Sequence, residues 1–297
     1  MKIAESLLYR LARSCPHPRA DKQLLNGARA GSEEYENAYC RLQLEHRFRR
    51  GIDVVPTDLS VLEIGCGHGG IACYLALAGA KRVVGIDINR ENLTRAEQFA
   101  ELTARRFGAE AKLAVEFLEM DAYNLTFPAE SFDLVVSDKS FEHFMQPDRV
   151  MQQAFQVLRP GGHLVVPSFS SIYSKYGLHL KEGLHAPWAN LFFSQQTIIH
   201  VMQRLVREDP HLESAYPGVF RNPQHVRDLR PYGDLNDITF SKFKRMASDA
   251  GFKMVRFRPF STLLGKVVAR TPLLKNTRLN DILSIGASAL LQKPTAS

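Results

Sequence analysis

The stretch 61-VLEIGCGHGG-70 decides the fold class, because a short apolar run ends there in a cluster of glycines. Gly65, Gly67 and Gly70 fit the pattern G-x-G-x-x-G, in which glycines bring the backbone close to a pyrophosphate at a helix N-terminus. Glu63 does not fit that pattern, because a carboxylate repels a pyrophosphate and attracts an ammonium group. The stretch therefore predicts a strand, a ligand-binding loop and a helix. Its glycines favour a ligand with a pyrophosphate, whereas Glu63 favours a ligand with an ammonium group.

The segments after this loop alternate between strand and helix patterns. Apolar runs of strand length are VLEI at 61–64, RVVGID at 82–87, VEFLEM at 115–120, DLVVS at 133–137 and HLVVP at 163–167. Segments with helical spacing lie at 71–79, 90–108 and 148–159. This alternation predicts βαβ units around a parallel sheet, and the continuous apolar runs predict strands that are buried on both faces.

Four regions follow from these patterns. Residues 1–50 are predicted to form an N-terminal helical segment, and residues 51–167 the α/β core. Residues 168–236 are rich in Tyr, His and Pro, hold the single Trp, and predict a helical cap inserted after the core. Residues 237–297 are predicted to complete the sheet, with a helix over 239–252 and strands over 253–260 and 285–293.

The composition is that of a globular protein. Of the 297 residues, 45% are hydrophobic and 23% are charged, and no apolar run approaches the roughly 20 residues of a membrane span. The N-terminus lacks the uninterrupted apolar core of a signal peptide, so we expect a cytoplasmic protein. The four cysteines, at 15, 40, 66 and 73, form no C-x-x-C pair, so neither a zinc ribbon nor a disulfide framework is predicted.

The net charge of +7 is concentrated at the end of the chain, where residues 251–297 hold eight Lys or Arg and one Asp. Such a segment attracts nucleic acid, an anionic substrate or an anionic membrane surface. Lys266 and Arg270 are one helical turn apart, opposite Leu264 and Val268, which is a weak surface-helix pattern. We expect the apolar residues to pack on the sheet edge, and a weak contact with a membrane surface is the alternative.

Polar residues stand at the strand ends, where open α/β sheets bind their ligands. Glu63 lies in the first predicted strand, Asp87 ends the second, Asp121 follows the third, and Ser137-Asp138 follows the fourth. Asp87 is placed to accept hydrogen bonds from ribose hydroxyls, as also in a NAD enzyme, and Asp121 from the amine of adenine. With Glu63 they predict a nucleoside ligand that carries a cation and no phosphate, which is the character of S-adenosylmethionine. Taken singly, each aspartate could instead cap the helix after its strand.

These stretches resemble the class I S-adenosylmethionine-dependent methyltransferases, in the small-molecule group sometimes called type 11 or type 25. The matching stretches are VLEIGCGHGG, GIDIN, MDAYNLTFPAESFDLVVSD, SFEHF and VLRPGGHLVV, over about residues 60–167. The resemblance implies a doubly wound, seven-stranded, Rossmann-like sheet whose last strand runs antiparallel between its neighbours, with S-adenosylmethionine as cofactor. It further implies that Gly65, Cys66 and Gly67 approach the methionine part, Asp87 binds the ribose, Ile88 packs on adenine, Asp121 and Ala122 flank the adenine edge, and Ser137 contributes backbone.

The chemistry of methyl transfer asks for little beyond positioning, with a general base where the nucleophile carries a poorly acidic proton. Candidates for that base are His143 and Glu142, in 138-DKSFEHF-144 after the fourth strand. A packing or capping role is the alternative, because a Glu-His pair recurs here in the resembling families whatever their substrate. A similar Phe-Glu-His stretch occurs in the cyclopropane fatty acid synthases, but their further signature residues are not seen in this sequence.

The cap is the predicted acceptor surface. Its stretch 173-YSKYGLHLKEGLHAPW-188 contains the candidates Tyr173, Tyr176, His179, His185 and Trp188. Aromatic side chains with a few polar groups suit a mostly apolar ligand pocket. The two histidines are six residues apart, which does not suit metal ligands on one helix face, so no metal is expected. The alternative is a lid that is packed for stability alone.

We therefore expect an enzyme that transfers a methyl group from S-adenosylmethionine to a small, partly apolar acceptor. A nucleic-acid methyltransferase is the alternative within the fold, favoured by the basic end of the chain and opposed by the absence of an N-P-P-Y-like motif after the fourth strand. A NAD(P)-binding oxidoreductase is opposed by Glu63, Asp121 and the missing Tyr-x-x-x-Lys pair. A non-catalytic protein that only binds S-adenosylmethionine is opposed by the intact glycine loop.

Overall fold

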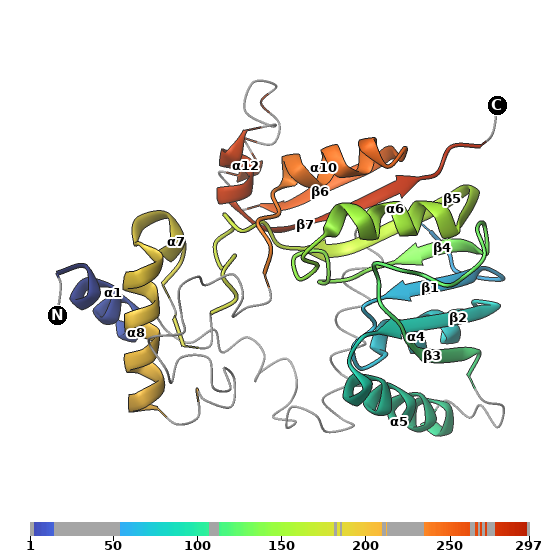
Figure 1. Cartoon of the computed structure of the whole chain (residues 1–297), viewed down its shortest axis with the longest axis horizontal. Helices are drawn as coiled ribbons and strands as arrows, with labels where there is room; N and C mark the ends of the chain where they lie inside the picture. Colours follow the sequence, from blue (N-terminus) through green and yellow to red (C-terminus); the bar gives the residue numbers. More distant parts are fainter. Residues whose placement is uncertain are drawn as a thin grey trace.

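A seven-stranded sheet runs through the computed structural model in the order β3-β2-β1-β4-β5-β7-β6 (Figure 1). The structure describes residues 3–14, 54–106, 113–180, 183–184, 186–209, 212, 235–261, 265–266, 268, 271 and 277–295. Strands β1 to β5 pair in parallel, and β7 runs antiparallel to its neighbours β5 and β6. The predicted fold class, a doubly wound α/β sheet with its last strand antiparallel between two others, is confirmed.

Each strand expected from the apolar runs is present. The bounds are β1 Ser60–Ile64, β2 Arg82–Asp87, β3 Val115–Glu119, β4 Phe132–Val136, β5 Leu158–Phe169, β6 Lys253–Ser261 and β7 Ser284–Gln292. β5 begins earlier than predicted, because Leu158 already pairs with Phe132 before a register shift, after which the pairing resumes at His163. The expected burial on both faces is wrong for β3, which lies at one edge of the sheet and is partly exposed. β6 lies at the other edge, where Pro259 is tolerated.

The bounds of the helices are α1 Ile3–Ser14, α4 Gly70–Leu77, α5 Arg90–Arg106, α6 Pro147–Val157, α7 Ala189–Phe192, α8 Gln195–Glu208, α10 Phe240–Asp249 and α12 Arg278–Ile282. Four helices, α4, α5, α6 and α10, begin and end close to the predicted positions. Three of the described helices have a side-chain cap at the N-terminus. Ser194 accepts a hydrogen bond from the Thr197 N–H, and Thr239 accepts one from the Lys242 N–H. Asn89 caps α5 and accepts from the Glu91 and Asn92 N–H groups. α6 begins with Pro147, a residue suited to the first turn of a helix.

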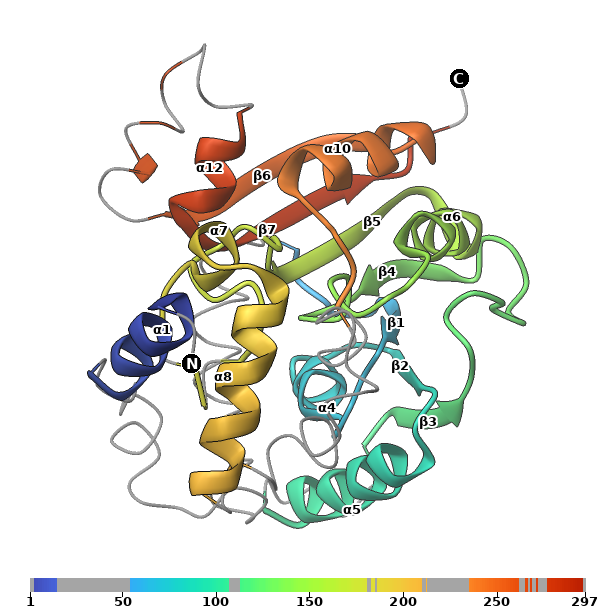
Figure 2. The ribbon, with the colours of Figure 1, turned by 60° about the vertical axis from the view of Figure 1, so that its left-hand side comes forward.

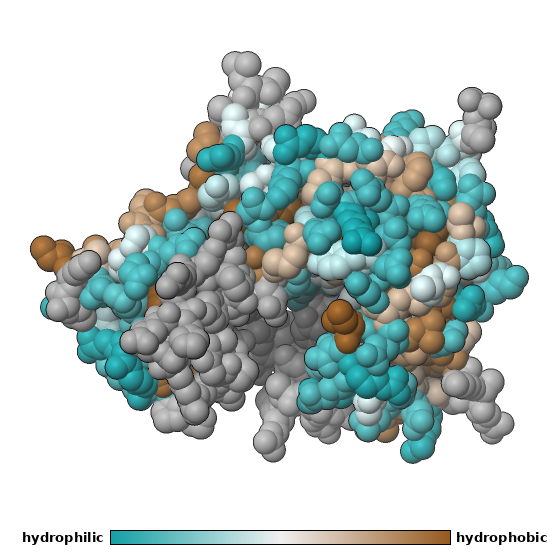
Figure 3. Space-filling view, viewed as in Figure 1, coloured by the Kyte–Doolittle hydropathy of each residue, from teal (hydrophilic) through white to brown (hydrophobic). Residues whose placement is uncertain are grey.

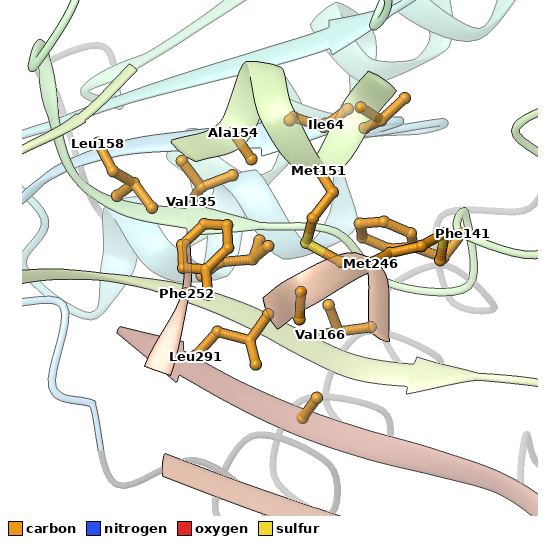
Figure 4. Close-up of a cluster of buried hydrophobic side chains, with 14 of the residues drawn as sticks. Ile64, Val135, Phe141, Met151, Ala154, Leu158, Val166, Met246, Phe252 and Leu291 are labelled. Carbon is orange, nitrogen blue, oxygen red and sulfur yellow. The ribbon is translucent and has the colours of Figure 1, made fainter. Parts of the chain in front are cut away.

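Two hydrophobic clusters cover the two faces of the sheet. α6 and α10 pack on one face, where Met151 and Met246 join strand residues such as Val135 and Val166 (Figure 4). α4 and α5 pack on the other face, through side chains such as Leu75 and Phe99. The outward surfaces of α6 and α10 are mostly hydrophilic (Figure 3), as expected for amphipathic helices with one buried face.

A third cluster joins the N-terminal helix to the cap. Leu8 and Ala12 of α1 pack with apolar residues of α8 and of residues 178–189. Polar contacts reinforce this packing, because Glu5 lies 2.8 Å from His200, which is on α8. Both ribbon views place α1 beside α8 (Figures 1 and 2). α1, α7 and α8 lie beyond the carboxyl ends of the parallel strands, the edge where such sheets bind ligands (Figure 1). The domain boundaries themselves stay a prediction.

The basic end of the chain is described only in part. Lys266 is exposed and Val268 is buried, while Leu264 and Arg270 lie outside the described residues. The segment with the weak surface-helix pattern is therefore mostly outside the described part of the chain, and both interpretations of it stay predictions. Among the residues that the structure does describe, no helix combines the length and apolar character needed to cross a bilayer.

Candidate methyl-donor and acceptor site

The glycine loop after β1 leaves open space above its backbone. The N–H groups of Gly65 and Cys66 both donate to the Ile86 carbonyl at 2.9 Å, which fixes the loop to β2. Gly65 and Gly67 have φ values of +74° and +52°. A Cβ on Gly65 would lie 2.6 Å from Ser140 Oγ, whereas a Cβ on Gly67 would meet no described residue within 4 Å. The loop is thus packed on one side and open on the other, as a ligand cradle requires.

Asp87 fastens this loop from the end of β2. Its Oδ2 accepts a hydrogen bond from the Gly67 N–H at 2.9 Å. Its Oδ1 accepts one from the Asn89 N–H at 2.9 Å and one from the Asn92 side chain at 3.4 Å. An ionised carboxylate offers about four acceptor positions, so Asp87 keeps capacity for a ribose hydroxyl. The residue predicted to bind the ribose therefore also holds the loop in place.

Glu63 is a buried carboxylate with an unsatisfied oxygen. Its side chain is only 3% exposed, and its Oε2 has no hydrogen-bond partner among the described residues. Burial raises the pKa of Glu63 well above its usual range, the negative charges of Asp138 and Asp87 raise it further, and a hydrogen bond from the Ala72 backbone opposes the change. A cation bound beside Glu63 would relieve both the burial and the repulsion.

The residues expected around an adenine ring lie at the ends of β2 and β3. Ile88 is 73% exposed, which leaves its apolar side chain available to a planar ring. Asp121 is exposed and accepts a hydrogen bond from the Tyr123 N–H at 2.9 Å, so it closes a turn. It caps no helix, because β3 is followed by a loop and then by β4. Ala122 follows Asp121 in the chain and is partly buried.

Cys66 and Ser137 complete the predicted cofactor set from buried positions. Burial raises the pKa of the Cys66 thiol, so it stays protonated and unreactive. Ser137 is fully buried and its Oγ donates to the Ile64 carbonyl at 3.0 Å, which ties the end of β4 to the end of β1. The Ser137 side chain is therefore a structural tie.

The Phe-Glu-His stretch after β4 brings two titratable side chains together with one from the cap. Glu142 is 2% exposed, its Oε1 accepts a hydrogen bond from the Ser170 N–H at 3.2 Å, and its Oε2 has no partner among the described residues. His179, on the cap, places its Nε2 4.0 Å from Glu142 Oε1. The rings of His143 and His179 have their centroids 5.3 Å apart. Burial raises the pKa of Glu142 to about 7, with a smaller contribution from the charge of Asp138.

Asn236 is a site residue that the sequence did not single out. Its Nδ2 donates to the carbonyls of Phe141 and Phe144 at 2.7 and 2.6 Å, and its backbone N–H donates to the Glu142 carbonyl at 2.8 Å. Its own Oδ1 accepts from the Ile238 N–H at 2.8 Å. Asn236 thus fixes the backbone around Glu142 and His143. No spacing or periodicity marks it, because these contacts arise only when the end of the cap returns to the sheet.

The other predicted acceptor residues have different surroundings. Trp188 donates from its indole N–H to the Ile282 carbonyl at 2.6 Å, and the guanidinium of Arg278 lies 5.2 Å from the centre of the Tyr173 ring. Both contacts are with α12, and both side chains stay partly exposed, so packing on α12 leaves part of each available to a ligand. The Tyr176 ring lies 5.2 Å from the ammonium of Lys175. His185 lies outside the described residues, and those described include no group of three or more His, Cys, Asp or Glu that could hold a metal ion.

Comparison with known proteins decides the family. The family model described as a methyltransferase domain, type 11, matches residues 62–166. A fatty-acid O-methyltransferase of Mycolicibacterium smegmatis is 31% identical over 205 residues, which cover 68% of this chain and 69% of that protein. The chain belongs to the S-adenosylmethionine-dependent methyltransferases. The predicted family, enzyme class and cofactor are confirmed.

Two further comparisons bear on narrower points. The methyltransferase is 38% identical over 120 residues to the 27-O-demethylrifamycin SV methyltransferase of Amycolatopsis mediterranei, but these cover only 40% of this chain and 41% of that enzyme. A solved S-adenosylmethionine-dependent methyltransferase from Mesorhizobium loti superposes with a TM-score of 0.51 at 17% identity, over 84% of this chain and 97% of the other. This likeness supports the fold alone.

The residues of the methyltransferase fit the cofactor of its family. The unpartnered oxygen of buried Glu63 suits an ammonium group, and the open side of Gly67 leaves room for it. Asp87 retains acceptor capacity at the end of β2, and exposed Ile88 offers an apolar surface beside it. These four features come from two neighbouring strand ends, so they can act on one ligand.

Glu142 is expected to make the stability of the methyltransferase depend on pH. Because its pKa is raised from 4.5 to about 7, the folded state binds this proton more tightly than the unfolded state. The resulting stability is fully present below about pH 4.5 and is lost as the pH rises through about 7. The loss is on the order of 3 kcal/mol. Urea unfolding at several pH values should show this loss in the wild type and a smaller one in Glu142→Gln. Identical pH dependence in the two proteins would contradict the assignment.

Proposed function

We propose that the chain transfers a methyl group from S-adenosylmethionine to a small, partly apolar acceptor that binds between the sheet edge and the cap. The buried, unsatisfied carboxylate of Glu63 beside an open glycine loop is the observation that carries the cofactor side of this proposal. The acceptor side is supported by two relatives, whose names state that they act on 27-O-demethylrifamycin SV and on a fatty acid. A fatty acid has a long apolar chain, which fits the partly apolar acceptor that we propose.

When bound, the cofactor would supply a methyl group on a sulfonium sulfur for in-line transfer to the acceptor. In our proposal Glu63 pairs with the ammonium of the methionine part, and the open side of Gly67 lets that part approach the loop. Asp87 accepts hydrogen bonds from the ribose while it holds the Gly67 N–H. Ile88, Asp121 and Ala122 flank the adenine, and Ser137 acts through its backbone. Positioning of this kind supplies about 7–11 kcal/mol of the barrier reduction in well-oriented systems.

His143 is the proposed general base when the acceptor nucleophile carries a proton. It lies on the segment after β4, next to buried Glu142 and against His179, which is on the cap. An imidazole whose neighbours include a carboxyl group is well suited to accept a proton near neutral pH. Tyr173, Tyr176, His179, His185 and Trp188 remain the proposed acceptor residues of the cap.

The proposal also covers partners and location. We do not propose nucleic acid as the acceptor, because the segment after β4 carries Ser137-Asp138-Lys139-Ser140 and no base-flipping motif. Contact of the basic end of the chain with an anionic membrane surface stays a secondary proposal, tested by co-sedimentation with neutral and anionic vesicles. A cytoplasmic location likewise stays a prediction, tested by cell fractionation.

Transfer of a radiolabelled methyl group tests the proposed function directly. The chain would be incubated with labelled S-adenosylmethionine and a panel of long-chain fatty acids, hydroxylated polyketides, polar amines and oligonucleotides. We expect label in at least one acceptor of the first two classes, and none with Asp87→Ala. Labelling of oligonucleotides alone would favour the nucleic-acid alternative and contradict the proposal.

The cap's share in acceptor binding can be separated from cofactor binding. In a folded protein, Trp188→Ala is expected to raise the KM for the labelled acceptor at least tenfold and to leave the affinity for S-adenosylhomocysteine within about twofold. Trp188→Phe keeps an aromatic ring but loses the hydrogen bond to Ile282 and part of the ring surface, so it serves as the milder variant. Loss of cofactor affinity with unchanged acceptor KM would contradict this division of labour.

A further inference from the structure

The four-residue segment Phe141–Phe144 is held by both ends of the cap. Ser170, one residue after β5 ends, donates its N–H to Glu142 Oε1. Asn236, at the other end of the predicted cap, donates to three carbonyls of the segment, as described above. Between these ends, His179 approaches the same Glu142 oxygen to 4.0 Å. The cap therefore meets the proposed catalytic segment at three separate points, and two of them involve the Glu142 carboxylate.

The backbone at His179 is itself unusual. His179 has a φ of +54°, in the left-handed region that is unfavourable for a residue with a Cβ. Its N–H donates to the Tyr176 carbonyl at 2.9 Å, so a tight turn holds this conformation. Glycine or asparagine would be favoured at such a position for conformational reasons alone. Strained positions of this kind cluster at functional sites, where the surrounding structure maintains them.

The surroundings of the Glu142 carboxylate limit what it can do by itself. It is buried, and its second oxygen, Oε2, has no partner among the described residues. The titratable groups that act on it are Asp138 and Lys139 from its own segment, with opposite effects, and His179 from the cap. His143 follows it in the chain and contacts the ring of His179. A proton taken up by any member of this cluster changes the charge that the others experience.

We propose that His179 is a positioning residue for methyl transfer, which acts through Glu142 on the orientation and protonation of His143. This inference rests on the proposed function and adds to it a specific link between cap and base. Protonated His179 pairs with the Glu142 carboxylate and holds the cap over the segment. Neutral His143 is then the member of the cluster that accepts the proton of the acceptor, and that proton is released to water after methyl transfer. The imidazole of His179 need not touch the acceptor for this role.

The test is a proton titration of the histidine rings by NMR in the full chain saturated with S-adenosylhomocysteine. The protein contains ten histidines, so the signals of His143 and His179 are assigned by their loss in His143→Asn and His179→Asn. Asparagine tolerates the left-handed backbone of position 179, so His179→Asn removes the imidazole and keeps the turn. His179→Gly is the second variant, because glycine fits the same conformation. His200→Asn is the matched control, since His200 also pairs with a glutamate, Glu5, but lies on α8 away from the segment.

We expect the titration midpoint of His143 to move by about half a pH unit or more in His179→Asn and in Glu142→Gln. It moves to higher pH in His179→Asn, which removes a competing positive charge, and to lower pH in Glu142→Gln, which removes a negative one. It stays in place in His200→Asn. In turnover with an acceptor found by methyl labelling, His179→Asn lowers kcat on the order of tenfold with little change in the KM for S-adenosylmethionine.

An unchanged His143 midpoint in His179→Asn, His179→Gly and Glu142→Gln, with S-adenosylhomocysteine still bound, would overturn the inference and leave the proposed function intact. A change in acceptor KM alone would also overturn it, because His179 would then be an acceptor-binding residue only. Failure of the wild type to bind S-adenosylhomocysteine would contradict the proposed function itself. This binding is measured on the same samples, so the two failures can be distinguished.

Discussion

Glu63→Gln is expected to weaken the binding of S-adenosylhomocysteine about a hundredfold. Removal of one partner from a buried charge pair costs about 2–5 kcal/mol, and about 1.4 kcal/mol corresponds to a factor of ten in affinity. Glu63 is 3% exposed and has an oxygen without a partner among the described residues, so no water-filled surroundings weaken its attraction for an ammonium group. Glutamine keeps the size of the side chain and an oxygen for the Ala72 N–H. Isothermal titration of both proteins measures the difference.

The same substitution should not destabilise the unliganded protein. Without a cation, the Glu63 carboxyl is buried close to the negative charges of Asp138 and Asp87, which is unfavourable for its ionised form. We therefore expect Glu63→Gln to have an unchanged or higher Tm in the absence of ligand. Glu142→Gln is the matched control, because it neutralises another buried glutamate and should leave the affinity unchanged. Equal affinity of the wild type and Glu63→Gln would remove Glu63 from the ligand site.

Asp87→Ala is expected to weaken the binding of S-adenosylhomocysteine by at least tenfold. The substitution removes the proposed ribose acceptor and also frees the Gly67 N–H, which Asp87 holds at 2.9 Å. Each hydrogen bond to a charged group contributes about 1.5–3 kcal/mol, so loss of the ribose hydrogen bond alone corresponds to a factor of about 10 to 150, and release of the Gly67 N–H adds to it. Asp87→Asn keeps one acceptor oxygen and should lie between the alanine variant and the wild type.

Asp133→Ala is the control for a general loss of order in the sheet. Asp133 also accepts a backbone hydrogen bond, from the Ser60 N–H at 2.9 Å, but it lies at the start of β4, at the edge opposite the site. It pairs with Arg159 as well, at 2.5 Å. Its loss should lower stability and leave the affinity for S-adenosylhomocysteine within about twofold. If Asp133→Ala and Asp87→Ala weaken binding equally, Asp87 acts only through the stability of the fold.

The sheet could be predicted because its strands are specified by local sequence. The run RVVGID predicts β2 with both of its bounds, and the Gly-rich stretch after 61–64 predicts the ligand loop. The cofactor side of the site follows from the same signal, since Glu63 and Asp87 stand at strand ends that a parallel sheet brings to one edge. The dual role of Asp87 was not predicted, because its hydrogen bond to Gly67 depends on how the loop folds back over β2.

The contacts of the cap could not be predicted, because they join residues far apart in the chain. Asn236 contacts the segment at 141–144, and His179 contacts Glu142, only after the insertion has returned to the sheet. Trp188 was predicted as an acceptor residue from its aromatic character, yet its N–H bonds to Ile282 near the end of the chain. The packing of α1 on α8 joins residues almost 200 positions apart, as in the Glu5–His200 pair, and amphipathic spacing in either helix does not identify its partner.

Proton release on cofactor binding tests the central claim most directly. The claim is that burial and the charges of Asp138 and Asp87 raise the pKa of Glu63 in the free protein, and that pairing with the ammonium of the cofactor lowers it. S-adenosylhomocysteine would be titrated near neutral pH in two buffers with different ionisation enthalpies, with NAD as the competing ligand. We predict one-to-one binding of S-adenosylhomocysteine with net release of protons by the wild type, no release by Glu63→Gln, and no binding of NAD. Binding of NAD without S-adenosylhomocysteine, or proton release that is unchanged in Glu63→Gln, would contradict the account.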